Sequence, residues 1–455
     1  MRHGLIGSVL AVLLVGTAPG ARADVIDELF GLNRSQVPWV ETSIQAAKVR
    51  PLLEQLGSND YRTREAAGKA IYAMGDRAIP ALRQALKTIE DPEVARRVQV
   101  LARTLDAERL GTARKVTLKV VRRPAKEILT EIAKQTGYNL RYEGGGEEKV
   151  GLSYDFKETS FWEALDKVCD DAGLSANPQD DDGTLSVYYS DTTNPYTTYS
   201  GPFKIVATNI NSGRNVQLSG LQRRQANPRQ PESINLNFTV QSEPKAPLVG
   251  IGTVVLIKAT DDRGASIMPF DPQEGNQSTS FYPPPVVAYK SYAQGMSIGL
   301  NRADRSSTSI KELRGKVMVA LLSETRPELV IDDLLKVKKQ RFTGRTVEVE
   351  VISSDWQNNT LSLEMVVRQR NADPEDYSWT NSVFQRLEVL DANGVKFQFG
   401  GLTNQNVGQA VVSMTAQYMA PQGGRKVGPP AKLQYVEWIT VNREVAFTFK
   451  DIPLP

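Results

Sequence analysis

The feature that most constrains the fold is internal repetition, which changes its spacing along the chain. In residues 44–112, apolar side chains recur at helical spacing in four runs. A shift of 31 residues places Asp60 on Asp91 and Met74 on Leu105. Each unit reads as a helix, an Asp-containing turn and a second helix, and such units bury their apolar faces by stacking. We predict a short α-helical repeat, with a plain four-helix bundle as the alternative.

The second region, residues 113–190, repeats at a spacing of 36 residues, which places Leu129 on Leu165 and Gly137 on Gly173. In each half a strand-like run precedes a helical run that ends at one of these glycines. Ser160 and Glu163 have the spacing of a capping box at the start of the second helix. We predict a small duplicated α/β domain whose helices pack against a sheet.

The C-terminal half changes to strand-like alternation. Residues 191–202 are polar, contain Asn194-Pro195 and Gly201-Pro202, and are predicted to be a linker. Short apolar runs separated by Gly, Asn and Asp then follow, which is typical of antiparallel sandwiches. We predict two Ig-like β-sandwiches, residues 203–337 and 338–455. The predicted fold class is therefore multidomain α + β.

A weaker repeat relates the two predicted sandwiches. Two pairs of segments match: Ile257–Gly264 with Leu387–Gly394, and Leu329–Leu334 with Phe447–Ile452. The match leads us to expect that Val445–Phe449 is the last strand of the second sandwich. That strand should stop near Asp451, because Pro453 has no N–H to donate to a sheet. Deletion of residues 444–455 is then expected to unfold the second sandwich and spare the first.

The N-terminus has the three parts of a secretory signal peptide. Met1–His3 is short and basic, Leu5–Val15 is apolar, and Ala21-Arg22-Ala23 fits the small-x-small cleavage pattern. We predict a signal peptide over residues 1–23, with an uncleaved anchor as the alternative, and a short N-terminal segment over residues 24–43. No other apolar run reaches the roughly 18 residues that a membrane helix needs. The chain is therefore expected to be exported, to the periplasm or the medium, without a transmembrane span.

Cleavage after Ala23 limits the available chemistry. The one histidine, His3, would leave with the signal, so the mature chain could hold neither a Ser-His-Asp site nor a zinc site that uses imidazole. Cys169 is the single cysteine and cannot form an intramolecular disulfide. With 55 basic and 52 acidic residues, the chain has no charge excess that suggests nucleic acid as a partner.

Acidic clusters are the remaining candidates for metal binding or hydrolysis. Asp180–Gly183 could bind calcium, but no glutamate closes an EF-hand loop, so a solvated hairpin turn is the preferred interpretation. The pairs Asp261-Asp262 and Asp332-Asp333 are interpreted as solvated strand ends. Paired carboxylates could run glycoside hydrolysis, yet no spacing singles out an acid and a nucleophile. We assign no catalytic, cofactor-binding or metal-ligating residue and expect no cofactor.

Several further features have a structural interpretation beside a functional one. Gly144–Gly146 precedes a strand, so it is interpreted as a loop and not as a phosphate cradle. Cys169 is interpreted as a packed thiol. The aromatic residues Trp39, Phe161 and Trp162 are candidates for binding or, with preference, for the core. The segment Phe270–Pro285 ends in a proline run and is the candidate for an exposed contact loop.

Two regions resemble known families. Asp60-Tyr-Arg-Thr-Arg-Glu-Ala-Ala resembles the turn and second helix of HEAT repeats. Glu127–Asn139 and Phe161–Asp166, the latter with Ala172-Gly-Leu174, resemble the two halves of the short N-terminal (STN) domain of secretins and TonB-dependent receptors. This resemblance implies a module that docks protein partners in the bacterial periplasm. The chain departs from those families because no secretin pore domain and no membrane barrel follow.

The modules together indicate binding and not catalysis. The predicted function is protein–protein interaction or assembly in a bacterial envelope, by a protein that is not an enzyme. A carbohydrate- or peptidoglycan-binding protein, with lectin-like sandwiches, is the second interpretation. A hydrolase that uses carboxylates alone is the third. Exposed aromatic triplets would favour sugar binding, and a cleft with two facing carboxylates would favour the enzyme.

Overall fold

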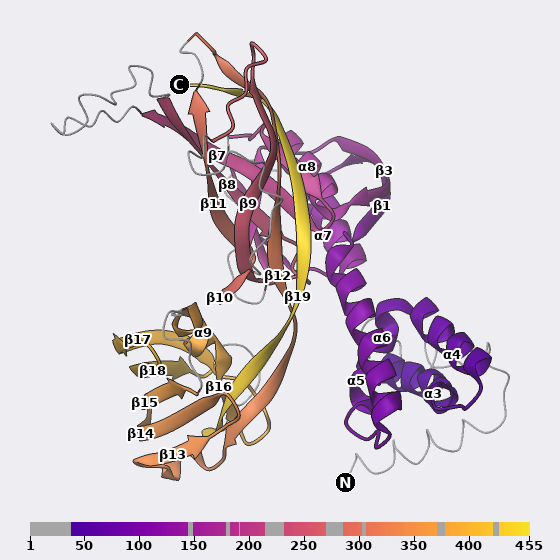
Figure 1. Ribbon diagram of the computed structural model, residues 1–455, viewed down its shortest axis with the longest axis vertical. Helices are drawn as coiled ribbons and strands as arrows, with labels where there is room; N and C mark the ends of the chain where they lie inside the picture. The colour runs from indigo at the N-terminus through magenta and orange to yellow at the C-terminus, as the bar shows by residue number, and fades with distance from the viewer. Residues whose placement is uncertain are drawn as a thin grey trace, which may run out of the picture. The chain divides into compact units, whose positions relative to one another are not determined.

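The computed structural model describes residues 38–143, 149–178, 183–190, 192–213, 232–269, 285–302, 306–370, 378–421 and 427–455, with side chains from residue 47 and without those of Val286 and Ser378. The chain forms two compact units, one up to Arg109 and one from Leu110 onward (Figure 1). Among the described residues, no helix is both long and apolar enough to cross a membrane.

The first unit is helical, as the sequence predicts. Its elements are α3 (Pro38–Leu56), α4 (Tyr61–Ala73), the 3-10 turn η2 (Gly75–Ala78), α5 (Ile79–Ala85) and most of α6 (Pro92–Gly111). The first helix begins at Pro38, before the expected boundary at residue 44. Val49, Ile71 and Leu82 lie in one buried cluster. The helices therefore share a single core.

The two aspartates that the 31-residue repeat aligns have the same role. The Asp60 carboxylate accepts a hydrogen bond from the Thr63 N–H at 2.8 Å. The Asp91 carboxylate accepts from the N–H groups of Glu93 at 2.8 Å and Val94 at 3.2 Å. Each aspartate thus caps the N-terminus of a helix, where backbone N–H groups lack partners. This confirms the equivalence of the two positions.

The α/β domain at the start of the second unit contains β1 (Lys115–Arg123), α7 (Ala125–Thr136), β2 (Leu140–Tyr142), β3 (Leu152–Ser160), α8 (Phe161–Ala172), β4 (Leu174–Pro178) and β5 (Leu185–Tyr189). Here the single predicted sheet is wrong. The first strands of the two halves pair as an antiparallel ribbon, β1 with β3, and the second strands flank β5 in a separate sheet of order β2-β5-β4. Each half therefore contributes one strand to each sheet.

The helix ends of this domain follow the sequence signals. Gly137 and Gly173 end α7 and α8 with φ of 73° and 67°, the left-handed conformation that glycine adopts at no steric cost. The Ser160 hydroxyl accepts from the Glu163 N–H at 3.4 Å, which confirms half of the capping box. The Glu163 carboxylate contacts the Ser160 hydroxyl and not its backbone N–H. Leu129 and Leu165 are buried in the core of the domain, as predicted.

The rest of the second unit consists of β-strands around two buried cores. The elements are β6 (Thr197–Ser200), β7 (Phe203–Gly213), β8 (Glu232–Ser242), β9 (Leu248–Asp261), β10 (Val286–Ser291), β11 (Ala293–Arg302), β12 (Ser309–Ile331), η4 (Leu334–Lys336), β13 (Gln340–Thr343), β14 (Val347–Gln357), β15 (Thr360–Gln369), α9 (Ser378–Arg386), β16 (Leu387–Asp391), β17 (Gln398–Val407), β18 (Val411–Met419) and β19 (Pro430–Pro453). We call the part around the core of β7 and β8 the first β-lobe, and the part around the core of β14 and β15 the second β-lobe.

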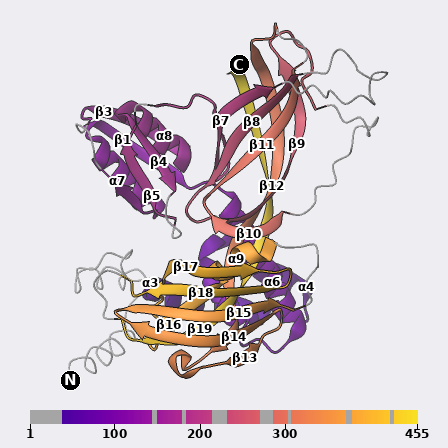
Figure 2. The same ribbon diagram turned by 90° about the vertical axis from the view of Figure 1, so that its left-hand side faces the viewer.

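The two β-lobes repeat one strand order. In the first, one sheet has the order β11-β8-β7-β6; in the second, the sheet β13-β14-β15-β18-β17 contains the same succession with one strand added at its end. Both lobes share the remaining sheet, of order β10-β9-β12-β19-β16 (Figure 2). The predicted linker over residues 191–202 is wrong in part, since Thr197–Ser200 pairs with Phe203–Val206 as an edge strand. Its Thr-Thr-Tyr sequence suits a strand.

Two very long strands, β12 and β19, pass from one β-lobe into the other. They pair antiparallel from Ser309↔Pro453 to Ile331↔Leu433 and lie side by side in Figures 1 and 2. The first half of β12 fills the core of the first β-lobe with Leu313 and Val317, and its end reaches the second core with Ile331. Strand β19 does the reverse, because Leu433 lies in the second core and Phe447 in the first.

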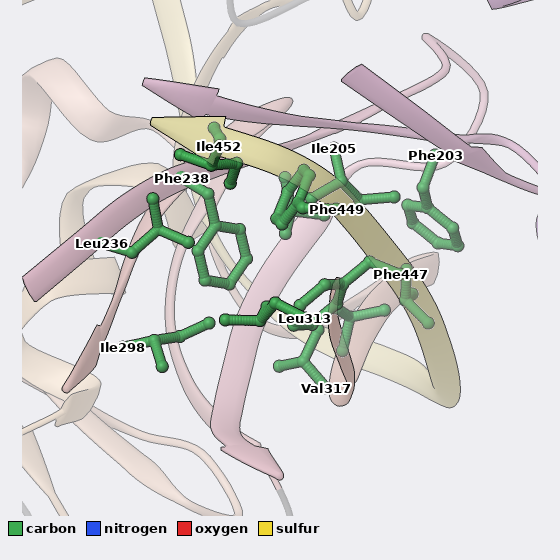
Figure 3. Packing of buried hydrophobic residues seen from close by; sticks show 14 of the residues in the cluster. Phe203, Ile205, Leu236, Phe238, Ile298, Leu313, Val317, Phe447, Phe449 and Ile452 are labelled. Carbon is green, nitrogen blue, oxygen red and sulfur yellow. The ribbon is translucent and has the colours of Figure 1, made fainter. Parts of the chain in front are cut away.

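The expected place of the C-terminal strand is therefore wrong. Val445, Phe447, Phe449 and Ile452 pack into the first β-lobe, not the second (Figure 3). Phe447 and Phe449 lie with ring centroids 5.1 and 6.1 Å from that of Phe238. The sequence repeat identifies Leu329–Leu334 and Phe447–Ile452 as equivalent segments. It does not show which lobe each segment enters, because β12 and β19 each run from one lobe into the other without a turn. A boundary between residues 337 and 338 cannot separate lobes that exchange their last strands.

Candidate protein-docking surface

A buried carboxylate, Glu243, ties the α/β domain to the first β-lobe. It follows β8 directly and is completely buried. Its carboxylate accepts a hydrogen bond from the Tyr138 hydroxyl at 2.6 Å and from the Arg114 N–H at 3.1 Å. The ammonium group of Lys245 lies 3.8 Å away. Burial raises the pKa of Glu243, while the bond from Tyr138 and the charge of Lys245 act in the opposite direction.

A second polar cluster fixes helix α8 to the β6–β7 hairpin. Asp166 accepts from Lys204 and from the Tyr199 hydroxyl, both at 2.7 Å. The Trp162 indole N–H donates to the Pro202 carbonyl at 3.1 Å, and the Lys204 ammonium lies 5.6 Å from the centroid of the Trp162 ring. These groups are buried or nearly so, and a buried charge that loses its partner is costly. These contacts join the α/β domain to the first β-lobe.

Both ribbon views draw α8 between the first β-lobe and the β1–β3 ribbon (Figures 1 and 2), and the first pair of the ribbon, Lys115↔Ser160, adjoins the attachment at Arg114. The two strands pair with each other and with no other strand of the described residues. Val121 on β1 is 67% exposed. Register shifts flank the regular part of the ribbon, and Arg122 and Glu158 there have positive φ. The ribbon thus exposes Val121 beside strands that pair with no further described strand.

The charge of the ribbon is concentrated on β1. Between residues 114 and 126 the chain carries no acidic residue and six basic ones: Arg114, Lys115, Lys119, Arg122, Arg123 and Lys126. Arg123 forms an ion pair with Glu127 at 3.1 Å. Lys115, Lys119 and Arg122 are exposed. This edge is suited to an acidic, extended segment of a partner.

The acidic pairs considered as sites hold turns and strands in place. Asp261 is buried, so its interpretation as a solvated strand end is wrong; it accepts from two backbone N–H groups of its own turn and from the Ser307 hydroxyl. Asp262 accepts from the hydroxyl and N–H of Thr308, and these bonds lower its pKa. Asp332 and Asp333 form ion pairs with Lys432 and Lys336. Within the described ranges, no group of three or more His, Cys, Asp or Glu side chains has the grouping of a metal site.

The other candidate residues are in the core or beyond the described part. Phe161 and Trp162 are fully buried, which confirms the preferred core interpretation. Cys169 is buried, and burial raises the pKa of its thiol to about 12, so a packed thiol is the correct interpretation. Four features lie outside the described residues, wholly or in the part that matters: Gly144–Gly146, Asp180–Asp182, the side chain of Trp39 and most of Phe270–Pro285.

Sequence reasoning missed one surface, the edge formed by β17. The chain has no charged residue from Phe397 to Gly424, which is its longest uncharged run. This run contains the hairpin of β17 and β18, and β17 is the end strand of its sheet. Thr403 to Val407 are all exposed. A scan for the absence of charge, and not for chemical groups, would have found it.

Comparisons of the chain with models of protein families, with curated proteins and with solved structures find no match.

Proposed function

We propose that the protein is an exported, non-catalytic component of a bacterial envelope that binds other proteins through the β1–β3 ribbon of its α/β domain. In this proposal the helical region is a short HEAT-like array, the α/β domain is STN-like, and the β-lobes are Ig-like sandwiches. The observation that carries it is the combination of a buried polar attachment of the α/β domain with an exposed, basic ribbon.

The attachment supports a docking role because it reduces the cost of binding. A domain that is already fixed loses little orientational freedom when a partner binds. The polar clusters around Glu243 and Asp166 use α8, Tyr138 and the Arg114 N–H, which leaves the part of the ribbon beyond Lys115 for a partner. The resemblance to STN domains, which bind periplasmic proteins, points in the same direction.

The two alternative functions lack a comparable observation. Sugar binding would need clustered exposed aromatic side chains on a β-lobe. Among the described residues, the large aromatic side chains most exposed there are Tyr289 and Phe399, on different strands. Hydrolysis would need two facing carboxylates in a cleft, whereas Glu243 and Asp166 are both engaged by structural partners.

The proposal is tested by charge reversal on β1. Lys119→Glu combined with Arg122→Glu should reduce capture of a partner from envelope extract by about tenfold or more, because the two changes reverse exposed charges that would contact an acidic partner. Lys134→Glu, an exposed change on α7, is the matched control and should leave capture unchanged. Equal capture by all three proteins would contradict the proposal. Co-sedimentation with isolated peptidoglycan by each protein would instead favour the sugar-binding alternative.

A further inference from the structure

The β17 edge differs chemically from the opposite edge of the same sheet. Strand β13 has four residues, and its Arg341 forms ion pairs with Glu348 and Glu350 at 3.5 and 3.4 Å. Short edges and charged side chains are the means by which proteins prevent edge-to-edge pairing. Strand β17 has ten residues and no charge. One edge of the sheet is thus protected and the other is open.

The open edge pairs regularly with β18 at its C-terminal end. Register shifts occur between Phe399 and Gly401 and between Leu402 and Asn404, and Gly401 has a φ of 129°. From Asn404 to Val407 the strand pairs with Thr415 to Val412 without a shift. In an antiparallel ladder, alternate residues of an end strand direct their N–H and C=O groups outward. These groups form a template for one more strand.

The side chains of β17 are suited to a second copy of the same strand. Asn404, Gln405 and Asn406 are exposed, and each amide both donates and accepts, so it can pair with its own kind. No like charges would meet across such a pairing. A two-fold axis at Gln405 would place Gln405 opposite its own copy and Asn404 opposite Asn406, within the regular part of the strand.

The fold already contains a pairing of this kind. The equivalent strands β12 and β19 of the two β-lobes pair antiparallel along almost their whole length. We propose that two copies of the protein associate by antiparallel pairing of their β17 edges. Such an interface is isologous and closes on itself, so it yields a dimer and not a fibre. The inference does not depend on the proposed function of the β1–β3 ribbon.

The test uses purified full chain alone, by sedimentation velocity from low to high micromolar concentration. Wild type should show a concentration-dependent dimer. Gln405→Lys and Gln405→Glu should each raise the dimer Kd at least about tenfold, because like charges then face one another. An equimolar mixture of the two variants should restore the dimer. Gln340→Lys, on the opposite edge, is the matched control and should dimerise as wild type does.

Folding of each variant is checked by its unfolding transition, and hydrogen exchange gives a second measurement. The amides of residues 404–407 should become more protected as the wild-type concentration rises, and those of residues 340–343 should not. A wild type that remains monomeric throughout, or dimerisation that the Gln405 variants leave unchanged, would overturn the inference. Failure to restore the dimer in the mixture would overturn it as well, because opposite charges at position 405 attract one another if the two β17 edges pair there.

Discussion

Asp261 and Asp391 occupy the same position in the two β-lobes and make the same hydrogen bonds. Each accepts through Oδ1 from the backbone N–H groups two and four residues later, at 3.0 and 2.7 Å for Asp261 and at 2.8 and 2.8 Å for Asp391. The glycine three residues on, Gly264 or Gly394, has a φ of 80° or 79°. The second oxygen accepts from Ser307 in one lobe and from Gly428 in the other. Two turns this alike confirm the weak sequence repeat at this point.

Replacing either aspartate with alanine should destabilise the protein. Asp261→Ala or Asp391→Ala leaves partly buried backbone N–H groups without an acceptor, which carries a desolvation cost. We expect each change to lower the thermal unfolding midpoint by several degrees. Asp332→Ala, at an exposed ion pair, is the control and should have little effect. Equal midpoints for all three variants would contradict a structural role for the turns.

The turn in the second β-lobe should also respond to pH. Backbone N–H groups, that of Val395 foremost, lower the pKa of Asp391. A carboxylate with a lowered pKa stabilises the folded state above its ordinary pKa, and this contribution is lost as the pH falls through the lowered value. Asp391→Asn should therefore show a smaller loss of stability on acidification than wild type. Chemical unfolding at several acidic pH values measures this difference, and identical pH profiles would argue against it.

Removal of the C-terminal strand should damage the first β-lobe. Phe447→Ala should cost about 3–5 kcal/mol of unfolding free energy, because a buried aromatic ring is lost from that core. Deletion of residues 444–455 should expose the amides of residues 203–213 and 232–242 to hydrogen exchange before those of residues 347–369. Phe342→Ala, at a partly buried position of the second lobe, is the comparison. Exposure of residues 347–369 first would restore the original assignment of the strand.

Glu243 should make the attachment of the α/β domain sensitive to pH in the opposite sense. Because its pKa is raised, the folded protein binds its proton more tightly than the unfolded chain between the ordinary and the raised value. The free energy of unfolding therefore falls as the pH rises through that interval. Glu243→Gln keeps an acceptor for Tyr138 and should remove this slope, whereas Glu364→Gln, at an exposed position, should not. A slope that survives in Glu243→Gln would show that another group causes it.

The core of the α/β domain gives a direct test of packing. Leu165→Ala should cost roughly 2–5 kcal/mol, the usual range for a fully buried leucine. Denaturant titration measures the change, with Thr130→Ala on the exposed face of α7 as the control. A cost below about 0.5 kcal/mol would contradict the burial of this face.

Local signals predicted local structure well, and long-range exchange escaped them. The caps at Asp60, Gly137 and Gly173 depend on neighbouring residues, so the sequence contains them directly. The sequence does not show which of the two cores each end of β12 and β19 enters, because apolar residues of both strands pack into both cores. The same contrast between local and long-range information applies to the proposed docking surface. The basic residues of β1 are visible in the sequence, but their exposure depends on where Glu243 and Asp166 hold the domain.

Site-specific photo-cross-linking in living cells tests the docking claim most directly. A cross-linking amino acid at Val121 on the β1–β3 ribbon should form a discrete adduct with another envelope protein. The same amino acid at Tyr189, which is 51% exposed on the other sheet of the same domain, should not. Loss of the Val121 adduct on Lys119→Glu would tie it to the basic edge. The absence of any adduct from Val121, or equal adducts from both positions, would contradict the proposal that this ribbon binds a protein partner.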